Sequence, residues 1–182
     1  MNDAILETTA SLAGQHGLRG VTMSQIAEQV GIGRATLYKY FNDVEAILVA
    51  WHERHVAAHL ALLVELRDRA STPLDRLRTV IEGYALILYE IAREHGARDV
   101  TALVHEGHHH ARAERNLHQL ILDLIVEAVS SGDVRDDIAG EELVAYCTHS
   151  VSAASVLPST DAVHRLVGVV LAGLRPQGAV GR

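Results

Sequence analysis

The chain has 182 residues, of which 48% are hydrophobic, and a formal net charge of −7 at pH 7. This length allows one or two compact units with a sizeable core, and the acidic balance excludes a protein that binds nucleic acid through general basic charge. Apolar runs are short and acidic residues stand near the start, so we expect no signal peptide and no membrane span. The single cysteine, Cys147, excludes an intrachain disulfide and fits a core position in a cytoplasmic protein.

Residues 22–45 are the most informative stretch, because they predict two short helices around a glycine turn and the start of a third helix. A helix over about 3–16 precedes them. Thr22 and Gln25 have the spacing of a T-x-x-Q capping box. Apolar residues then recur at helical spacing on one face, at Met23, Ile26, Ala27 and Val30. Gly31 follows, where a helix can end in a left-handed residue.

The second helix of this pair is predicted over 34–40, capped by Gly33. Leu37 and Phe41 would point inward, which leaves a polar set facing outward: Arg34, Thr36, Tyr38, Lys39 and Tyr40. An arginine can bond guanine bidentately, and tyrosine or lysine can reach phosphates. The alternative is a helical hairpin whose polar face is only solvated. We predict that DNA is contacted by Thr22, Ser24, Gly33, Arg34, Ala35, Thr36, Tyr38, Lys39 and Tyr40.

Beyond this segment only helical patterns follow, so the fold class is all-α, with about nine helices. The predicted ranges are 44–70, 73–95, 98–106, 111–130, 140–157 and 161–174. The first of these has an apolar stripe at Ile47, Leu48, Trp51, His55, Leu62 and Leu66. Thr72 and Pro73 have the cap and first-residue preferences of a new helix. We divide the chain into a domain over 1–48 and a second helical domain over 49–182.

The last predicted helix has an apolar stripe and a second side of small apolar residues, at Gly168, Val169, Ala172 and Gly173. Such a helix needs more than one packing partner. We therefore predict a homodimer formed through the last two helices, about 140–174.

The segment around the glycine turn resembles the DNA-binding domain of the TetR family of bacterial transcriptional regulators. The resemblance covers about residues 3–50 and rests on Thr22, Ile26-Ala27, Gly31-Ile32-Gly33, Thr36-Leu37-Tyr38-Lys39-Tyr40-Phe41 and Val44-Glu45. Gly33 and Val44 depart from the serine and lysine usual in the family. The resemblance implies a homodimer that reads an inverted repeat, a C-terminal cavity for a small-molecule effector, and repression that the effector relieves. It implies no enzymatic activity, and we expect no cofactor.

The effector, whose identity is not implied, would occupy a mostly apolar cavity. Aromatic side chains are the candidates to line it: Trp51, Tyr84, Tyr89 and Tyr146.

A histidine-rich segment gives two alternatives. His105 to His109 match the H-E-x-x-H pattern of zinc peptidases, but Gly107 interrupts the helix that such chemistry needs. A metal-responsive regulator could instead use the segment 105–118, with His105, His109 and His149 as candidate ligands. The more remote alternative is an enzyme or scaffold built on the helical bundle, without DNA binding. Sequence-specific DNA binding that weakens steeply with salt separates the last alternative from the other two.

Overall fold

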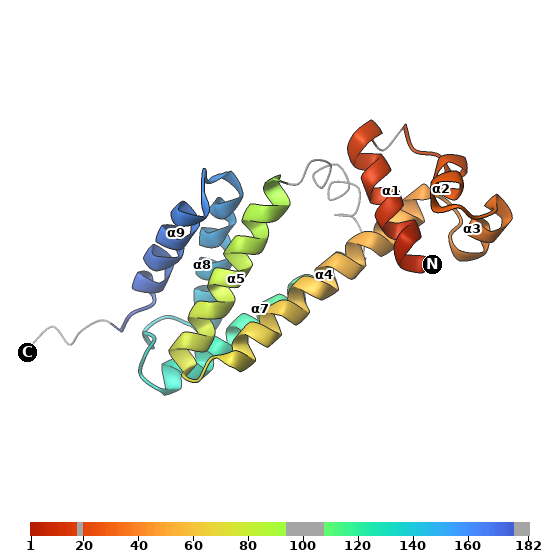
Figure 1. The fold of residues 1–182 in the computed structure, drawn as a ribbon. Coiled ribbons are helices and arrows are strands. Elements are labelled where there is room, and N and C mark those ends of the chain that lie inside the picture. The colour runs from red at the N-terminus through yellow and green to blue at the C-terminus, as the bar shows by residue number, and fades with distance from the viewer. Residues whose placement is uncertain (18–19, 94–107, 177–182) are drawn as a thin grey trace, which may run out of the picture. The chain divides into compact units, whose positions relative to one another are not determined.

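The computed structural model describes residues 1–17, 20–93 and 108–176, with the side chains of 108–111 left out. In these ranges every regular element is a helix, as the sequence predicts (Figure 1). The elements are α1 (Asn2–His16), α2 (Met23–Val30), α3 (Arg34–Tyr40), α4 (Val44–Arg69), α5 (Pro73–Arg93), α7 (His108–Ser130), α8 (Gly140–Ser152), the 3₁₀ helix η2 (Ala153–Val156) and α9 (Thr160–Gly173). The helix predicted over 98–106 lies outside the described residues. No described helix combines the length and the apolarity needed to cross a membrane.

Packing divides the chain into two compact units, and the division falls within α4. Residues up to Ala58 belong to the first unit, and the second unit begins at His59. The boundary predicted at residue 48 stays a prediction. It separates a DNA-binding from an effector-binding function, whereas the division found here rests on packing alone.

The N-terminal unit has its own core, built by α1, α2, α3 and the first part of α4. Ile5, Ile26, Leu37 and Ile47 have no exposed surface. The one buried polar side chain of the described core, Thr9, donates its hydroxyl hydrogen to the Ile5 carbonyl oxygen over 2.7 Å. Burial of apolar surface therefore holds the three short helices together, at about 25 cal/mol for each Å² removed from water.

The C-terminal unit is built around α5, which lies beside α8, η2 and α9 (Figure 1). Thr72 accepts a hydrogen bond from the Asp75 amide over 3.1 Å, and Pro73 opens the helix, so both predictions about this start are confirmed. Cys147 is completely buried, and burial raises the pKa of its thiol to about 12. It is a core side chain, as the sequence predicts, and not a reactive thiolate.

Two details of the helices differ from the sequence prediction. Leu62, assigned to the buried stripe of α4, is 44% exposed, whereas its neighbour Leu63 is 2% exposed. Helix α4 contributes its first part to one core and residues such as Leu63 to the other, so a single stripe does not describe both buried faces. The helix predicted over 140–157 ends as α8 at Ser152 and continues as the 3₁₀ turn η2.

Candidate nucleic-acid interface and effector pocket

The turn between α2 and α3 is fixed by its own hydrogen bonds. Thr22 accepts the Gln25 amide hydrogen over 3.3 Å, and Gln25 accepts the Thr22 amide hydrogen over 2.9 Å, which confirms the capping box. Gly31 has a φ of 75°, the left-handed value that glycine adopts at little cost. The Ile32 amide then donates to the Ala27 carbonyl over 2.9 Å. These contacts end α2 at Val30 and set where the next helix can begin.

Helix α3 presents one apolar side chain inward and its polar side chains outward. Leu37 is completely buried, whereas Tyr38 is 47% and Tyr40 52% exposed. Arg34 and Lys39 are exposed as well, and Thr36 is half-buried. The helix packs against α2, whose N-cap Thr22 and first-turn residue Ser24 are exposed. The nine residues predicted to contact DNA therefore lie on two adjacent helices and their connection.

The start of α4 has a packed valine at the position where the family pattern has a lysine. Asp43 accepts the Ala46 amide hydrogen over 2.7 Å and so caps the helix. Val44, at the position of the usual lysine, is half-buried and packs against the N-terminal core. This position contributes to packing and offers no cation to a phosphate.

An ionic clamp in the N-terminal unit joins α1 to α4. Arg54 donates to Asp3 over 2.6 Å and also to Glu7. The Trp51 indole donates to the second oxygen of Glu7 over 3.3 Å. Trp51 also lies against His55, with ring centroids 4.0 Å apart. This effector candidate therefore serves the contact between α1 and α4.

The three candidate tyrosines belong to the C-terminal unit, two of them on α5 and one on α8. Tyr84 is half-buried, and burial, assisted by the charge of Glu114, raises its pKa. Tyr89 is buried, with the Arg93 guanidinium 4.2 Å from its ring centroid. Tyr146, by contrast, is 38% exposed, and its hydroxyl donates to the Val170 carbonyl over 3.3 Å. It lies on the outer side of α8 and α9.

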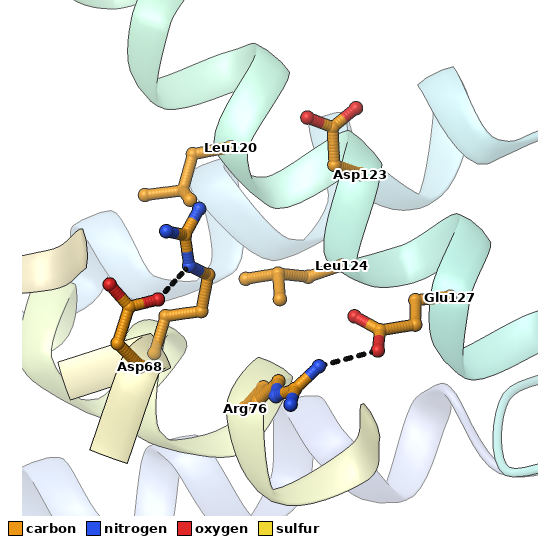
Figure 2. A pocket seen from close by; sticks show the side chains of 7 residues that line it. Asp68, Arg76, Leu120, Asp123, Leu124 and Glu127 are labelled. Carbon is orange, nitrogen blue, oxygen red and sulfur yellow. Dashed lines mark hydrogen bonds and ion pairs between the residues drawn. The ribbon is translucent and has the colours of Figure 1, made fainter. Parts of the chain in front are cut away.

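The C-terminal unit contains a polar pocket of about 510 Å³ where α4 ends and α5 begins, facing α7 (Figure 2). Its lining consists of Arg67, Asp68, Arg76, Leu120, Asp123, Leu124 and Glu127. Arg76 donates to Glu127 over 2.6 Å and to the Ala70 carbonyl over 3.1 Å. Arg67 donates to Asp68 over 2.8 Å, and this bond lowers the pKa of the Asp68 carboxyl.

This pocket differs from the mostly apolar, aromatic cavity that the sequence predicts. None of the four aromatic candidates lines it. Its charged groups come from three helices, and no motif in the sequence relates Arg67 to Asp123, so sequence reasoning did not find it. The sequence does not predict the ion pairs of Arg54 for the same reason, because its partners are 51 and 47 residues away.

The histidine candidates give no metal site in the described part of the chain. No group of three or more His, Cys, Asp or Glu side chains there could hold an ion. His149 is exposed, and its Nδ1 donates to the Ala145 carbonyl over 2.8 Å. His118 pairs with Glu141 over 2.5 Å. His105 and the side chain of His109 lie outside the described residues.

Two family models match the chain, one for each part. The first, described as bacterial regulatory proteins of the tetR family, covers residues 5–51. The second, described as the C-terminal domain of an SbtR-like transcriptional regulator, covers residues 90–176. The first contains the turn and α3, and the second contains α7, α8 and α9.

Curated relatives are distant regulators. The HTH-type transcriptional regulator BetI of Serratia proteamaculans (strain 568) is 28% identical over 82 residues, which are 43% of this chain and 41% of that protein. The chain thus matches about two fifths of that relative's length. The fatty acid metabolism regulator protein of Bacillus subtilis (strain 168) is 24% identical over 140 residues, covering 74% of this chain and 71% of the relative.

Solved structures agree in fold. A regulator of the TetR/AcrR family from Thermobifida fusca YX-ER1 superposes with a TM-score of 0.80 at 19% identity, over 96% of this chain and 98% of that one. FadR of Bacillus subtilis, solved in complex with stearoyl-CoA, gives a TM-score of 0.75 at 15% identity, over 96% of this chain and 100% of that one. At these identities the likeness concerns the fold alone.

Proposed function

The chain belongs to the TetR family of bacterial transcriptional regulators, which are not enzymes, and from that premise we propose a ligand-responsive repressor that binds a palindromic operator as a homodimer. The observation that carries this proposal is the exposed polar face of α3, which follows a turn closed by the left-handed Gly31. A helix of this kind fits the major groove of B-DNA.

The proposed roles follow from the chemistry of each exposed group. Arg34, at the N-terminal end of α3, is where a recognition helix reads base edges, and its guanidinium can bond guanine bidentately. Tyr38, Lys39 and Tyr40 would donate to phosphate oxygens. Thr22, Ser24, Gly33, Ala35 and Thr36 complete the contact surface.

Dimerisation explains how a recognition helix of only seven residues can select an operator, because two copies of it act together. A twofold dimer presents two copies of α3 about 34 Å apart, or at a multiple of that spacing, and so selects an inverted repeat. An effector that favours a different spacing of the two copies lowers operator affinity, and the operator lowers effector affinity by the same factor.

For the effector we propose a small molecule bound by the C-terminal domain. FadR of Bacillus subtilis was solved with stearoyl-CoA, which makes a long-chain acyl-CoA a reasonable first probe. The charged pocket at Arg67 and Arg76 supports a polar part of the ligand at least as well as an apolar one. A screen should therefore include polar and amphipathic molecules together.

The proposal is tested by selecting bound sequences from a random double-stranded DNA library with the purified full chain. We expect an enriched inverted repeat. Tyr38→Ala and Lys39→Ala should then each weaken binding to that repeat at least tenfold, equivalent to about 1.4 kcal/mol, while leaving the helical content unchanged.

Arg78→Ala is the matched control, because Arg78 is an exposed cation on α5 in the other unit. It should retain operator affinity. Failure to enrich any motif at low salt with folded protein, or full binding by both α3 variants, would contradict the assignment of α3.

A further inference from the structure

The N-terminal unit carries very little positive charge for a DNA-binding surface. Up to Ala58 the chain has four lysine and arginine residues against six aspartate and glutamate residues. The cations are Arg19, Arg34, Lys39 and Arg54, and the acids are Asp3, Glu7, Glu28, Asp43, Glu45 and Glu53. Lys39 is the only lysine in the whole chain.

One of these cations, Arg54, is held in ion pairs within its own unit and is therefore not counted among the groups that contact DNA. Both terminal nitrogens of the Arg54 guanidinium are engaged: Nη1 donates to Asp3, and Nη2 donates to Glu7. The indole of Trp51 holds Glu7 from its other oxygen. Arg54 therefore neutralises two acids of its own unit.

A second potential cation is missing at the start of α4. Val44 is packed against the N-terminal core, and the residues on either side of it are the exposed acids Asp43 and Glu45. Of the four cations, Arg19 lies outside the described residues, and Arg34 and Lys39 remain, both exposed and both on α3. The neutral donors around them are numerous, since Thr22, Ser24, Tyr38 and Tyr40 are exposed as well.

We propose that this regulator holds its operator mainly through neutral hydrogen-bonding and apolar groups, with Arg34 and Lys39 as the only two cationic contacts of each protomer. The proposal rests on the proposed function. Because non-specific DNA binding comes almost entirely from counterion release, a surface with two cations should bind random DNA weakly while still discriminating its operator.

The number of cationic contacts sets a measurable salt dependence. Each neutralised phosphate contributes about −0.9 to the slope of log affinity against log salt. Two contacts predict a slope of about −1.8 per bound protomer, or about −3.6 for a dimer. A fourfold rise in salt should then weaken a dimer's operator binding by about 150-fold, which is a modest loss for a protein–DNA complex.

The experiment is fluorescence anisotropy with the full chain, the selected operator and a potassium chloride series, with the stoichiometry fixed by sedimentation. Val44→Lys should steepen the slope to about −2.7 per protomer, and Lys39→Gln should flatten it to about −0.9. Val44→Gln, which has similar length without charge, is the matched control and should leave the slope unchanged.

Two further variants test the cations that the proposal leaves out. Arg54→Gln and Arg19→Gln should each leave the slope unchanged. If either variant made the slope flatter by about 0.9 per protomer, that arginine would be a third cationic contact, and the proposal would be overturned. A slope of about −2.7 or steeper per bound protomer for the unmodified protein, or about −5.4 or steeper for a dimer, would overturn it as well. These outcomes require a bound operator, so they differ from failure of the proposed function, in which no motif is enriched.

Discussion

Two glycines in the turn before α3 have different physical roles although only one residue separates them. Gly31 has a φ of 75°, a value that side chains bearing a Cβ rarely adopt. Gly33 has a φ of −69° and a ψ of 143°, which every residue adopts readily. It stands at the N-cap of α3 and makes no side-chain capping bond there. The two positions therefore call for opposite responses to the same substitution.

Gly33→Ser should stabilise the N-terminal unit by a few tenths of a kcal/mol, because a serine hydroxyl can accept an amide hydrogen of the first turn of α3. The new Cβ would lie 3.8 Å from the Thr36 hydroxyl, an ordinary contact. Gly31→Ser should instead cost about 1 kcal/mol, because serine is forced into the left-handed region. Urea unfolding followed by circular dichroism measures both. Equal shifts for the two variants would refute the distinction.

At this scale the sequence predicts local features well and distant ones poorly. The capping box of Thr22 and the left-handed Gly31 follow from spacings of a few residues, and the structure confirms both. The position of Tyr146 depends on α9, 24 residues further along the chain. The hydrogen bond of its hydroxyl to Val170 cannot be predicted without knowing that α8 packs against α9.

At the scale of elements, α4 and α5 approach closely within the C-terminal unit. A Cβ added at Gly83 would lie 2.7 Å from a methyl carbon of Leu66 and 3.1 Å from one of Leu63. Gly83 is buried, so an added side chain could not turn away into solvent. Because glycine has no side chain, α4 and α5 can approach each other this closely at residue 83.

Gly83→Val should therefore destabilise the C-terminal unit by about 1–3 kcal/mol, the usual cost of overpacking a filled core. Leu66→Ala alone should also destabilise, by removing a half-buried side chain from the same cluster. In the double variant the two losses should be smaller than their sum, because the methyl group that opposes valine is gone. Thermal unfolding of the four proteins gives the coupling, and strict additivity would rule out the contact as the cause.

The limits of prediction for elements have a physical cause as well. Helix ranges were predicted closely where caps and prolines mark them, as at Pro73. The buried face of α4 was predicted only in its first part, because α4 serves two cores and no single stripe describes a 26-residue helix in that position. The polar pocket at Arg67 and Glu127 joins separate helices, and periodicity within one helix contains no information about it.

At the scale of the whole molecule, the outer side of α8 and α9 has the surface expected of an interface between two copies. Val169 is 67% exposed, and Gly168, Ala172 and Gly173 are exposed beside it. The Tyr146 ring lies over Gly173, where an added Cβ would be 3.0 Å from its Cζ. The tyrosine is thus kept against the backbone of α9, and the surface formed by small residues stays open to close approach.

If this surface joins two protomers, Val169→Asp should convert the dimer to monomers, because a carboxylate would be buried there without a partner. Operator affinity should fall with it, since a single α3 reads only one half-site. Val126→Asp is the matched control, being an exposed valine on α7, outside α8 and α9. Sedimentation velocity reports the oligomeric state of each variant. An intact dimer after Val169→Asp, or dissociation by Val126→Asp alone, would place the interface elsewhere. A regulator that binds its inverted repeat would then have to bring its two copies of α3 together through another surface.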